Sequence, residues 1–232
     1  MGKTNSTERH TLEYSEVERD LGIMVEHNLK SEHQVMNAVA KASMSLSILR
    51  KTFKNWTPSI FKGLYTAFIR PHLEYAASAW SPYLKKDIQA LENVQRRATK
   101  RVKQLKNLSY EDRLKKLNLT TLEERRTRGD LIQFFKFHSN INTINWHQEP
   151  TIDVSNRPRR HSNQNRLVRP PPATCPQREN FFTYRVASHW NSLPQEIIQS
   201  GNVNQFKNRL DRHQRKEKPA VEEALRLRKI RI

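Results

Sequence analysis

The stretch 84-LKKDIQALENVQRRATKRVKQLKNLSYEDRL-114 decides the fold, because its first half has the pattern of an amphipathic helix. Apolar residues recur there at steps of three and four and therefore share one helical face: Ile88, Leu91, Val94, Ala98, Val102 and Leu105. The opposite face is crowded with cations: Arg96, Arg97, Lys100, Arg101 and Lys103. Like charges on one face repel each other, so this face favours contact with something negative. The pattern predicts a helix from about Asp87 to Leu105 that packs on one side and meets a polyanion on the other.

The N-terminal region carries the best strand signal. Leu21, Ile23 and Val25 alternate with their neighbours along the chain. This alternation predicts a short β ribbon within residues 14–30. Gly22 interrupts the run and indicates either a bulge or a close approach to the backbone.

Helix starts follow the ribbon at two places. Ser31, with Gln34 three residues later, matches the capping box that opens a helix. Thr57 and Pro58 combine a capping hydroxyl with proline at the first helical position. Pro71 lies inside the second helical pattern and predicts a kink or a break at the residue before it.

A further helix is predicted at about residues 122–139. Its cap is either Thr120 with Glu123 or Thr121 with Glu124. Its second half is apolar almost all round, so we expect that half to be buried.

Composition divides the chain into segments and predicts a mainly α fold, a short N-terminal β ribbon followed by a helical bundle. Helical periodicity dominates, and one basic, proline-rich stretch without a period reads as a linker. The predicted segments are a disordered N-terminus (1–13), the β ribbon (14–30), a helical domain (31–145), a basic Pro-rich linker (146–178), a small helical segment (179–211) and a charged tail (212–232).

The charge of the whole chain points to a polyanionic partner. Its 232 residues include 42 lysines and arginines against 23 acidic residues, a formal net charge of +19. This excess is beyond what solubility needs and favours nucleic acid first and an acidic membrane surface second. A single charge run is also typical of a solvated face, but three in one chain favour nucleic acid, mostly through phosphate contacts. The predicted nucleic-acid-binding residues are Arg96, Arg97, Lys100, Arg101 and Lys103, then Arg125, Arg126 and Arg128, then Arg157, Arg159 and Arg160.

Aromatic residues near these segments are candidates for stacking on bases. They are Tyr83, Tyr110, Tyr184 and Trp190. For Trp190 we prefer the alternative, which is packing in a core.

No arrangement of residues predicts catalysis. The aspartates are neither adjacent nor in a D-x-D pattern, so nothing indicates a two-metal site. There is no glycine-rich phosphate loop, and the histidines are scattered. The lone Cys175 can form neither a disulfide within the chain nor a finger-type zinc site. We therefore expect no catalytic residue, no metal or other cofactor and no enzymatic activity of this chain alone.

Four long motifs carry a resemblance to a known family, and they occur in the family's order. Together they resemble the C-terminal region of reverse transcriptases from non-LTR (LINE-like) retrotransposons of the jockey and chicken-repeat-1 type. The resemblance covers about residues 16–211. The motifs are 18-ERDLGIMVEHNLK-30, 64-LYTAFIRPHLEYAASAWSPYLKKDIQALENVQRRATK-100, 109-SYEDRLKKLNLTTLEERRTRGDLIQFFK-136 and 178-RENFFTYRVASHWNSLPQEIIQ-199.

The resemblance implies one part of an RNA-directed DNA polymerase. In the family, the catalytic aspartate pair of the palm lies N-terminal to these motifs, so the catalytic palm, the fingers and the Mg²⁺ of an intact member would be missing here. Leu21, Gly22 and Ile23 match a primer-grip-like segment at the end of the palm. Residues 31–145 would be the helical thumb, whose basic faces are expected to follow the backbone of a template–primer duplex. Residues 215–232 match nothing in the family.

Two hypotheses about function remain. In the first, the chain is a fragment of a retrotransposon polymerase that lacks the catalytic aspartates and keeps a role in binding the RNA/DNA hybrid or duplex. The missing palm and fingers would then be further partners. In the second, it is a repurposed helical module that binds nucleic acid or an acidic protein. No window of about 18 apolar residues exists, so we expect no membrane span. The single cysteine fits a reducing compartment, and we expect an intracellular location, nuclear or cytoplasmic.

Overall fold

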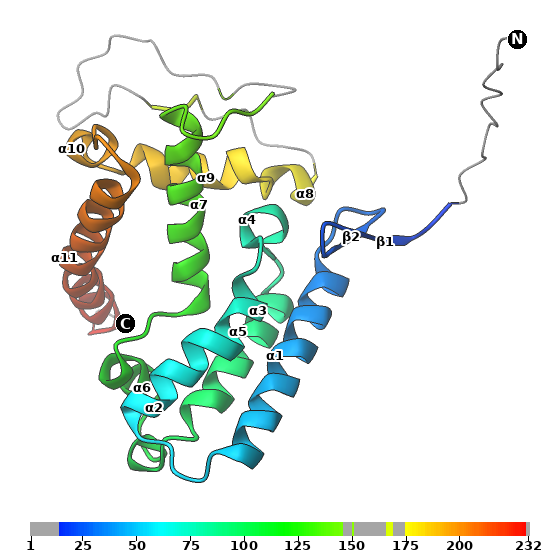
Figure 1. Ribbon diagram of the computed structural model, residues 1–232. Helices are drawn as coiled ribbons and strands as arrows, with labels where there is room; N and C mark the ends of the chain where they lie inside the picture. The colour runs from blue at the N-terminus through cyan, green and yellow to red at the C-terminus, as the bar shows by residue number, and fades with distance from the viewer. Residues whose placement is uncertain (1–13, 146–149, 151–165, 169–174, 231–232) are drawn as a thin grey trace, which may run out of the picture.

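The computed structural model describes residues 14–145, 150, 166–168 and 175–230, with side chains as far as residue 216 (Figure 1). The fold is mainly α, as the sequence predicts, with one short antiparallel hairpin at the N-terminal end. The elements in chain order are β1 (Val17–Asp20), β2 (Ile23–Glu26), α1 (Glu32–Thr52), α2 (Pro58–Leu64), the π-helix η1 (Tyr65–Ile69), α3 (Arg70–Glu74), α4 (Ala77–Trp80), α5 (Lys85–Thr99), the 3₁₀-helix η2 (Lys103–Leu105), α6 (Tyr110–Leu117), α7 (Leu122–His138), α8 (Pro176–Glu179), α9 (Phe182–Asn191), α10 (Gln195–Ile198) and α11 (Val203–Ile230).

The ribbon consists of two strands joined by a two-residue turn and is not one continuous strand. Asp20 pairs with Ile23, so Leu21 and Gly22 form the turn between β1 and β2. Both turn residues have positive φ, 46° and 86°, as tight hairpin turns require, and glycine adopts this conformation without strain. The alternation of Leu21 with Ile23 was therefore misleading: Leu21 is 85% exposed at the tip. Gly22 marks no bulge, but the expected close approach exists, since the Tyr75 hydroxyl donates to the Leu21 carbonyl at 3.0 Å.

The start of α1 is capped from the hairpin. Ser31 occupies the cap position but makes no side-chain cap hydrogen bond, so the predicted capping box is wrong. The carboxylate of Glu26, at the end of β2, accepts from the His33 amide at 2.7 Å instead. Gln34 is turned to the strand, where its side-chain oxygen accepts from the Met24 amide at 2.9 Å. These two contacts fix the hairpin on the first turn of α1.

Pro71 reshapes the second helical region in the predicted place. α2 begins at Pro58, and the Thr57 side chain accepts from the Ile60 amide, which confirms the predicted cap. Before Pro71 the helix widens into η1, with the Arg70 amide bonded to the Tyr65 carbonyl five residues back. A π-helical turn relieves the clash of a proline ring with the preceding turn, so the helix continues through α3.

The basic helix α5 ends at Thr99, six residues before the predicted end at Leu105. The chain then turns through Val102, whose extended backbone angles lead into η2. Val102 and Leu105 are nevertheless buried, because the turn folds both back against the core. Arg113 of α6 packs against this end and donates to the Thr99 hydroxyl at 3.1 Å.

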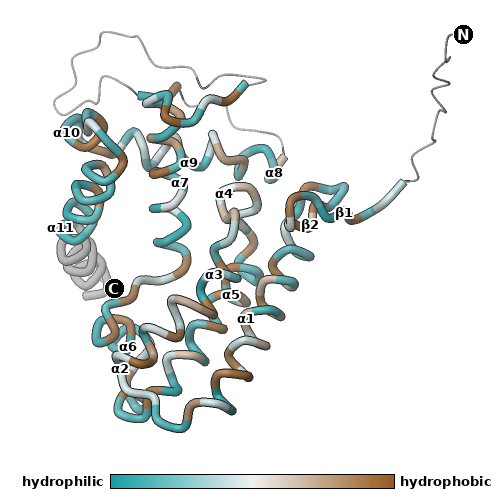
Figure 2. The backbone as a smooth tube through the Cα atoms, viewed as in Figure 1, coloured by the Kyte–Doolittle hydropathy of each residue, from teal (hydrophilic) through white to brown (hydrophobic). Residues whose placement is uncertain are grey.

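Two hydrophobic cores meet in α7. The first core lies among α1 to α6 and includes Leu122 in the first turn of α7. The second contains Leu131, Phe134 and Phe135 from the second half of α7, packed against α9, α10 and α11. The predicted burial of that half is confirmed. Figure 1 shows α9 crossing α7 and α11 beside it, and Figure 2 shows the alternation of hydrophobic and hydrophilic residues along the helices.

The C-terminal part does not follow the predicted segments. α11 continues through the expected boundary at residue 211. Leu167, inside the expected linker, is 5% exposed in the second core and exchanges two hydrogen bonds with the Asn191 side chain. Residues 1–13, which we expected to be disordered, lie outside the described residues. The same is true of most of the linker and of the end of the tail.

No helix in the described ranges combines the length and the apolar character needed to cross a membrane.

Candidate nucleic-acid interface

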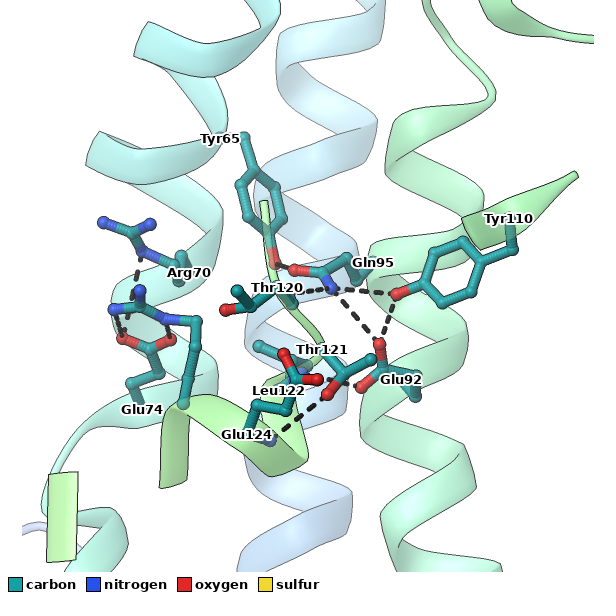
Figure 3. A network of polar contacts seen from close by, with 11 residues as sticks. Tyr65, Arg70, Glu74, Glu92, Gln95, Tyr110, Thr120, Thr121, Leu122 and Glu124 are labelled. Atoms are coloured by element: carbon teal, nitrogen blue, oxygen red, sulfur yellow. Dashed lines mark hydrogen bonds and ion pairs between the residues drawn. The ribbon is translucent and has the colours of Figure 1, made fainter. Parts of the chain in front are cut away.

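Two of the arginines predicted to bind nucleic acid are held by carboxylates within the fold. Arg125 binds Glu74 of α3 through two nitrogens, with Nη2 to Oε2 at 2.9 Å (Figure 3). Arg128 binds Asp211 of α11 in the same way, with Nη2 to Oδ2 at 2.9 Å. Two-pronged arginine–carboxylate pairs are geometrically specific and strong. These two arginines of the expected basic cluster therefore connect α7 to α3 and α11 and do not form a free cationic surface.

Arg126, the third member of that cluster, is buried. Its side chain is 5% exposed, and its two terminal nitrogens have no hydrogen-bond partner among the described residues. Burial lowers the pKa of the guanidinium, opposed chiefly by the charge of Glu92. Arg126 in this position cannot reach a nucleic-acid backbone.

A buried polar network lies beneath the basic face of α5 (Figure 3). The Gln95 amide donates to the Tyr110 hydroxyl at 2.8 Å, and its oxygen accepts from the Tyr65 hydroxyl. The Glu92 carboxylate accepts from Tyr110, and also from the Leu122 amide at 2.9 Å. This network joins α5 to η1, α6 and the start of α7.

The network fixes the protonation of its tyrosines. Burial, followed by the hydrogen bond to Glu92, raises the pKa of the Tyr110 hydroxyl well above its usual value. Burial likewise raises the pKa of Tyr65, with the charge of Glu74 next in importance. Tyr110 is therefore a structural donor and not a surface for base stacking. Trp190 is fully buried in the second core, as we preferred.

The first two arginines of the predicted α5 face are partly engaged. Arg96 is half-buried, with its guanidinium 4.4 Å from the centre of the Tyr110 ring. Arg97 is exposed and donates to the Ser43 hydroxyl of α1 at 3.0 Å. Both can present part of their charge to solvent, but each also holds its helix in place.

α1 and α5 run parallel and side by side (Figure 1), and their register places two basic segments together. Lys86 pairs with Glu32 at 2.7 Å, and Arg97 bonds Ser43. In both contacts the residue of α5 lies 54 positions after its partner in α1. Positions that face each other across the two helices therefore differ by about 54 in residue number. The same offset brings the last turn of α1, near Arg50, level with the turn that follows α5.

At this end of the bundle, two segments of the described chain expose seven cations. We call these residues the basic end: Arg50, Lys51, Lys54, Lys100, Arg101, Lys103 and Lys106. Neither segment that supplies them, residues 47–57 or residues 96–110, contains an aspartate or a glutamate. Two helix C-termini also point here, and cations near a C-terminus are stabilised by the helix dipole. Such clustering of one sign of charge creates a strong positive potential.

The sequence identified only part of the basic end. Lys100, Arg101 and Lys103 were predicted, although on a helix that has already ended. Arg50, Lys51 and Lys54 were missed, because the run 50-RKTFK-54 follows an apolar stripe and reads alone as the ordinary basic end of a helix. Only the parallel register of α1 and α5 brings the two runs together.

The other predicted site residues lie elsewhere. Leu21, Gly22 and Ile23 form the hairpin tip beside the N-terminal end of α1. α1 has 21 residues, so the hairpin and the basic end are separated by about 30 Å along this helix. Arg157, Arg159 and Arg160 lie outside the described residues. Within the described ranges, no three His, Cys, Asp or Glu side chains gather as a metal site would require.

Comparisons with known proteins find a distant relative. No family model matches the chain, and no solved structure matches it. A Caenorhabditis elegans protein designated "Uncharacterized protein B0403.1" is 26% identical over 131 residues, which is 55% of this chain and 64% of that protein. The match covers less than two thirds of the relative's length, and the designation states no activity.

Proposed function

We propose that this protein binds the phosphate backbone of a nucleic-acid duplex through the basic end. The observation that supports this proposal is the meeting of seven exposed cations, from two segments without any acid, at one end of the bundle. Lysine and arginine side chains that neutralise phosphates release counterions, and this release drives binding without sequence choice. Of the predicted arginines, Arg125, Arg126 and Arg128 are left out, because the fold uses or buries them.

The resemblance to non-LTR reverse transcriptases supports the choice of a duplex as the ligand. Three contacts connect the motifs that carry it: Tyr75 to Leu21, Glu74 to Arg125 and Asp130 to Arg185. These contacts connect all four motifs, so residues of the motifs hold one folded unit together. We infer that this unit is thumb-like, and that it holds a template–primer duplex for a catalytic palm and fingers outside this chain. Mg²⁺ and the polymerase chemistry belong to that palm in our proposal.

The geometry also suggests how a duplex would lie. The hairpin tip and the basic end are separated by about 30 Å, the length of about nine base pairs. A duplex that follows α1 would meet phosphate-binding cations at one end and the primer-grip-like hairpin at the other.

Salt dependence tests the proposal directly. We expect the chain to bind a duplex of 20 base pairs, DNA or RNA/DNA hybrid, with an affinity that falls steeply between about 50 and 200 mM salt. The triple variant K100Q/R101Q/K103Q should reduce the slope of log K against log salt by about 2 to 3. The matched control R212Q/R215Q/K216Q removes the same charge from exposed positions of α11, away from α1 and outside the basic end, and should leave the slope nearly unchanged.

Three outcomes would contradict this function. An equal loss of slope in both triple variants would mean that only net charge matters. A flat salt response would favour an acidic protein as the partner, as in the second hypothesis. Extension of a primed template by the chain alone would overturn the non-catalytic proposal.

A further inference from the structure

The outer face of α1 is apolar, although the chain as a whole is highly charged. Exposed apolar side chains recur there at steps of four, and we call them the α1 stripe: Met36, Ala40, Met44 and Ile48. Met36 is 63% exposed, Met44 68% and Ile48 54%. Lys41 is the one charged residue among the exposed positions of α1 from 36 to 48. A helix face that meets only water normally carries polar and charged residues, so this stripe is typical of a face that packs against a partner.

The π-helix η1 extends this apolar surface. α1 and the helical segment that follows it run antiparallel and are in contact along η1 and α3 (Figure 1). The Ser45 hydroxyl lies 3.1 Å from Nε2 of His72. Ile48 lies one turn further along α1, and Phe68 lies one turn back along η1, so the antiparallel directions place both at the same level. Phe68 is 54% exposed, and the stripe therefore continues toward a second helix at this level.

The size of this surface fits a weak protein interface. Side chains of this size that are half to two thirds exposed leave roughly 100 Å² each open to solvent, so Met36, Met44, Ile48 and Phe68 expose about 400 Å² together. The largest apolar patch of a monomeric protein has about this size and is often an interaction site. A standard interface covers about 800 Å² on each partner, so the small and polar residues beside the stripe would supply the other half.

The stripe is complementary to itself when two copies of α1 run antiparallel. A twofold axis opposite residue 42 places Ala40 of one copy against Met44 of the other, and Met36 against Ile48, because the members of each pair are equally far from residue 42. At the centre, each small side chain then faces a large one, which lets two helices pack closely. Such a twofold pairing covers the stripe of both copies at once and does not continue into a filament.

We propose that the α1 stripe, together with Phe68, is the interface of a symmetric dimer of this chain. A second copy fits better than an acidic protein, because a face with one lysine offers an acidic partner little charge to bind. Two copies of a chain with a net charge of +19 repel each other at long range. The dimer is therefore reversible, with a Kd of about 1–100 μM, and it strengthens as salt screens the repulsion. This dimer does not depend on the proposed duplex binding, which salt weakens.

The test is sedimentation velocity of the full chain under reducing conditions, at protein concentrations of about 1–200 μM. The average mass of the wild type should rise with concentration from that of one chain toward that of two. The variant M44E/I48E should fold, because both positions are exposed, and should weaken self-association by at least about tenfold. The matched control I141E/I144E makes the same change of charge at two exposed isoleucines after α7 and should associate like the wild type.

Disulfide formation tests the antiparallel register. With the exposed Cys175 replaced by serine, a mixture of A40C chains and M44C chains should form a disulfide between chains several-fold faster than either variant alone. Equal rates would overturn the twofold pairing at residue 42. A mass that stays at one chain at every concentration would overturn the dimer and leave the stripe to a different protein. Equal weakening in M44E/I48E and I141E/I144E, or self-association that falls steeply with salt, would overturn the apolar interface.

Discussion

At the scale of single residues, arginines and lysines have different roles in this protein. Arg125, Arg128 and Arg185 each bind one carboxylate through two nitrogens, and each joins helices that are distant in sequence. The basic end, in contrast, contains five lysines among its seven cations, and none has an ion-pair partner in the described part of the chain. The planar fork of arginine suits fixed joints, whereas lysine remains hydrated and mobile. A run of positive charge in the sequence does not separate these roles, and for that reason the predicted cluster of α7 was misassigned.

Replacement of Arg185 by lysine tests the fixed joint. Arg185 is 18% exposed and Asp130 8%, and the guanidinium also bonds the carbonyls of Ser78 and Asn180. Lysine keeps the charge but cannot make these bonds together, so we expect R185K to lower the free energy of unfolding by about 2–4 kcal/mol. Urea denaturation measures this loss. The control R178K, at an exposed position of α8, should change stability by less than about 0.5 kcal/mol, and an equally small effect of R185K would contradict the role of the fork.

The buried tyrosines predict a loss of stability in alkali. Because the fold raises the pKa of Tyr110 and Tyr65, both stay protonated in the native state after the unfolded chain begins to ionise near about pH 10. Unfolding then releases protons, so the stability contributed by each hydroxyl is complete below that pH and falls by about 1.4 kcal/mol per pH unit above it. Y110F removes one such group. Its stability, measured between about pH 9 and 11, should fall less steeply than that of the wild type, and parallel curves would contradict the assignment.

At the scale of elements, contacts between segments often decided what local patterns left open. The cap of α1 comes from Glu26 on the neighbouring strand, so Ser31 and Gln34 could not reveal it. α5 stops at Thr99 although its apolar period continues, because Val102 and Leu105 reach the core just as well from a turn. Where a local rule is strong, the sequence was sufficient: Thr121 accepts from the Glu124 amide, which selects one of the two caps considered for α7.

The cap supplied by Glu26 gives a prediction for the hairpin. Glu26 is 4% exposed and accepts from the first turn of α1, so E26A removes a helix cap and one attachment of β2. We expect E26A to lower the free energy of unfolding by about 1 kcal/mol. Compared with the wild type, amide exchange should become faster in β1 and β2 and should change less in α5. Hydrogen exchange read by mass spectrometry would measure both. E16A is the matched control, because Glu16 is exposed and accepts from His27 through its backbone carbonyl alone. If amide exchange in β1 and β2 were equal in E26A and E16A, the side chain of Gln34 alone would be sufficient to hold the hairpin on α1.

At the scale of the whole molecule, α7 makes the two cores one structure. Leu122 lies in the first core and Phe135 in the second, within a single helix of 17 residues. The apolar second half of this helix predicted its burial, but not against what. Its partners come from residues 167–210, more than thirty positions further along the chain, and no local pattern specifies such a pairing. The basic end was hidden for a similar reason, since it depends on the register of α1 with α5.

A shared helix predicts that the two cores unfold together. Phe206 is fully buried against Phe135, with ring centres 4.3 Å apart, and Phe61 is fully buried in the first core, stacked on Tyr65. F206L and F61L should each cost about 1–2 kcal/mol, since leucine fills most but not all of each space. In both variants, the most slowly exchanging amides of α1 and of α9 should lose protection by the same free energy. If F206L weakened α9 and left α1 unchanged, while F61L did the reverse, the cores would be independent units that only share a helix.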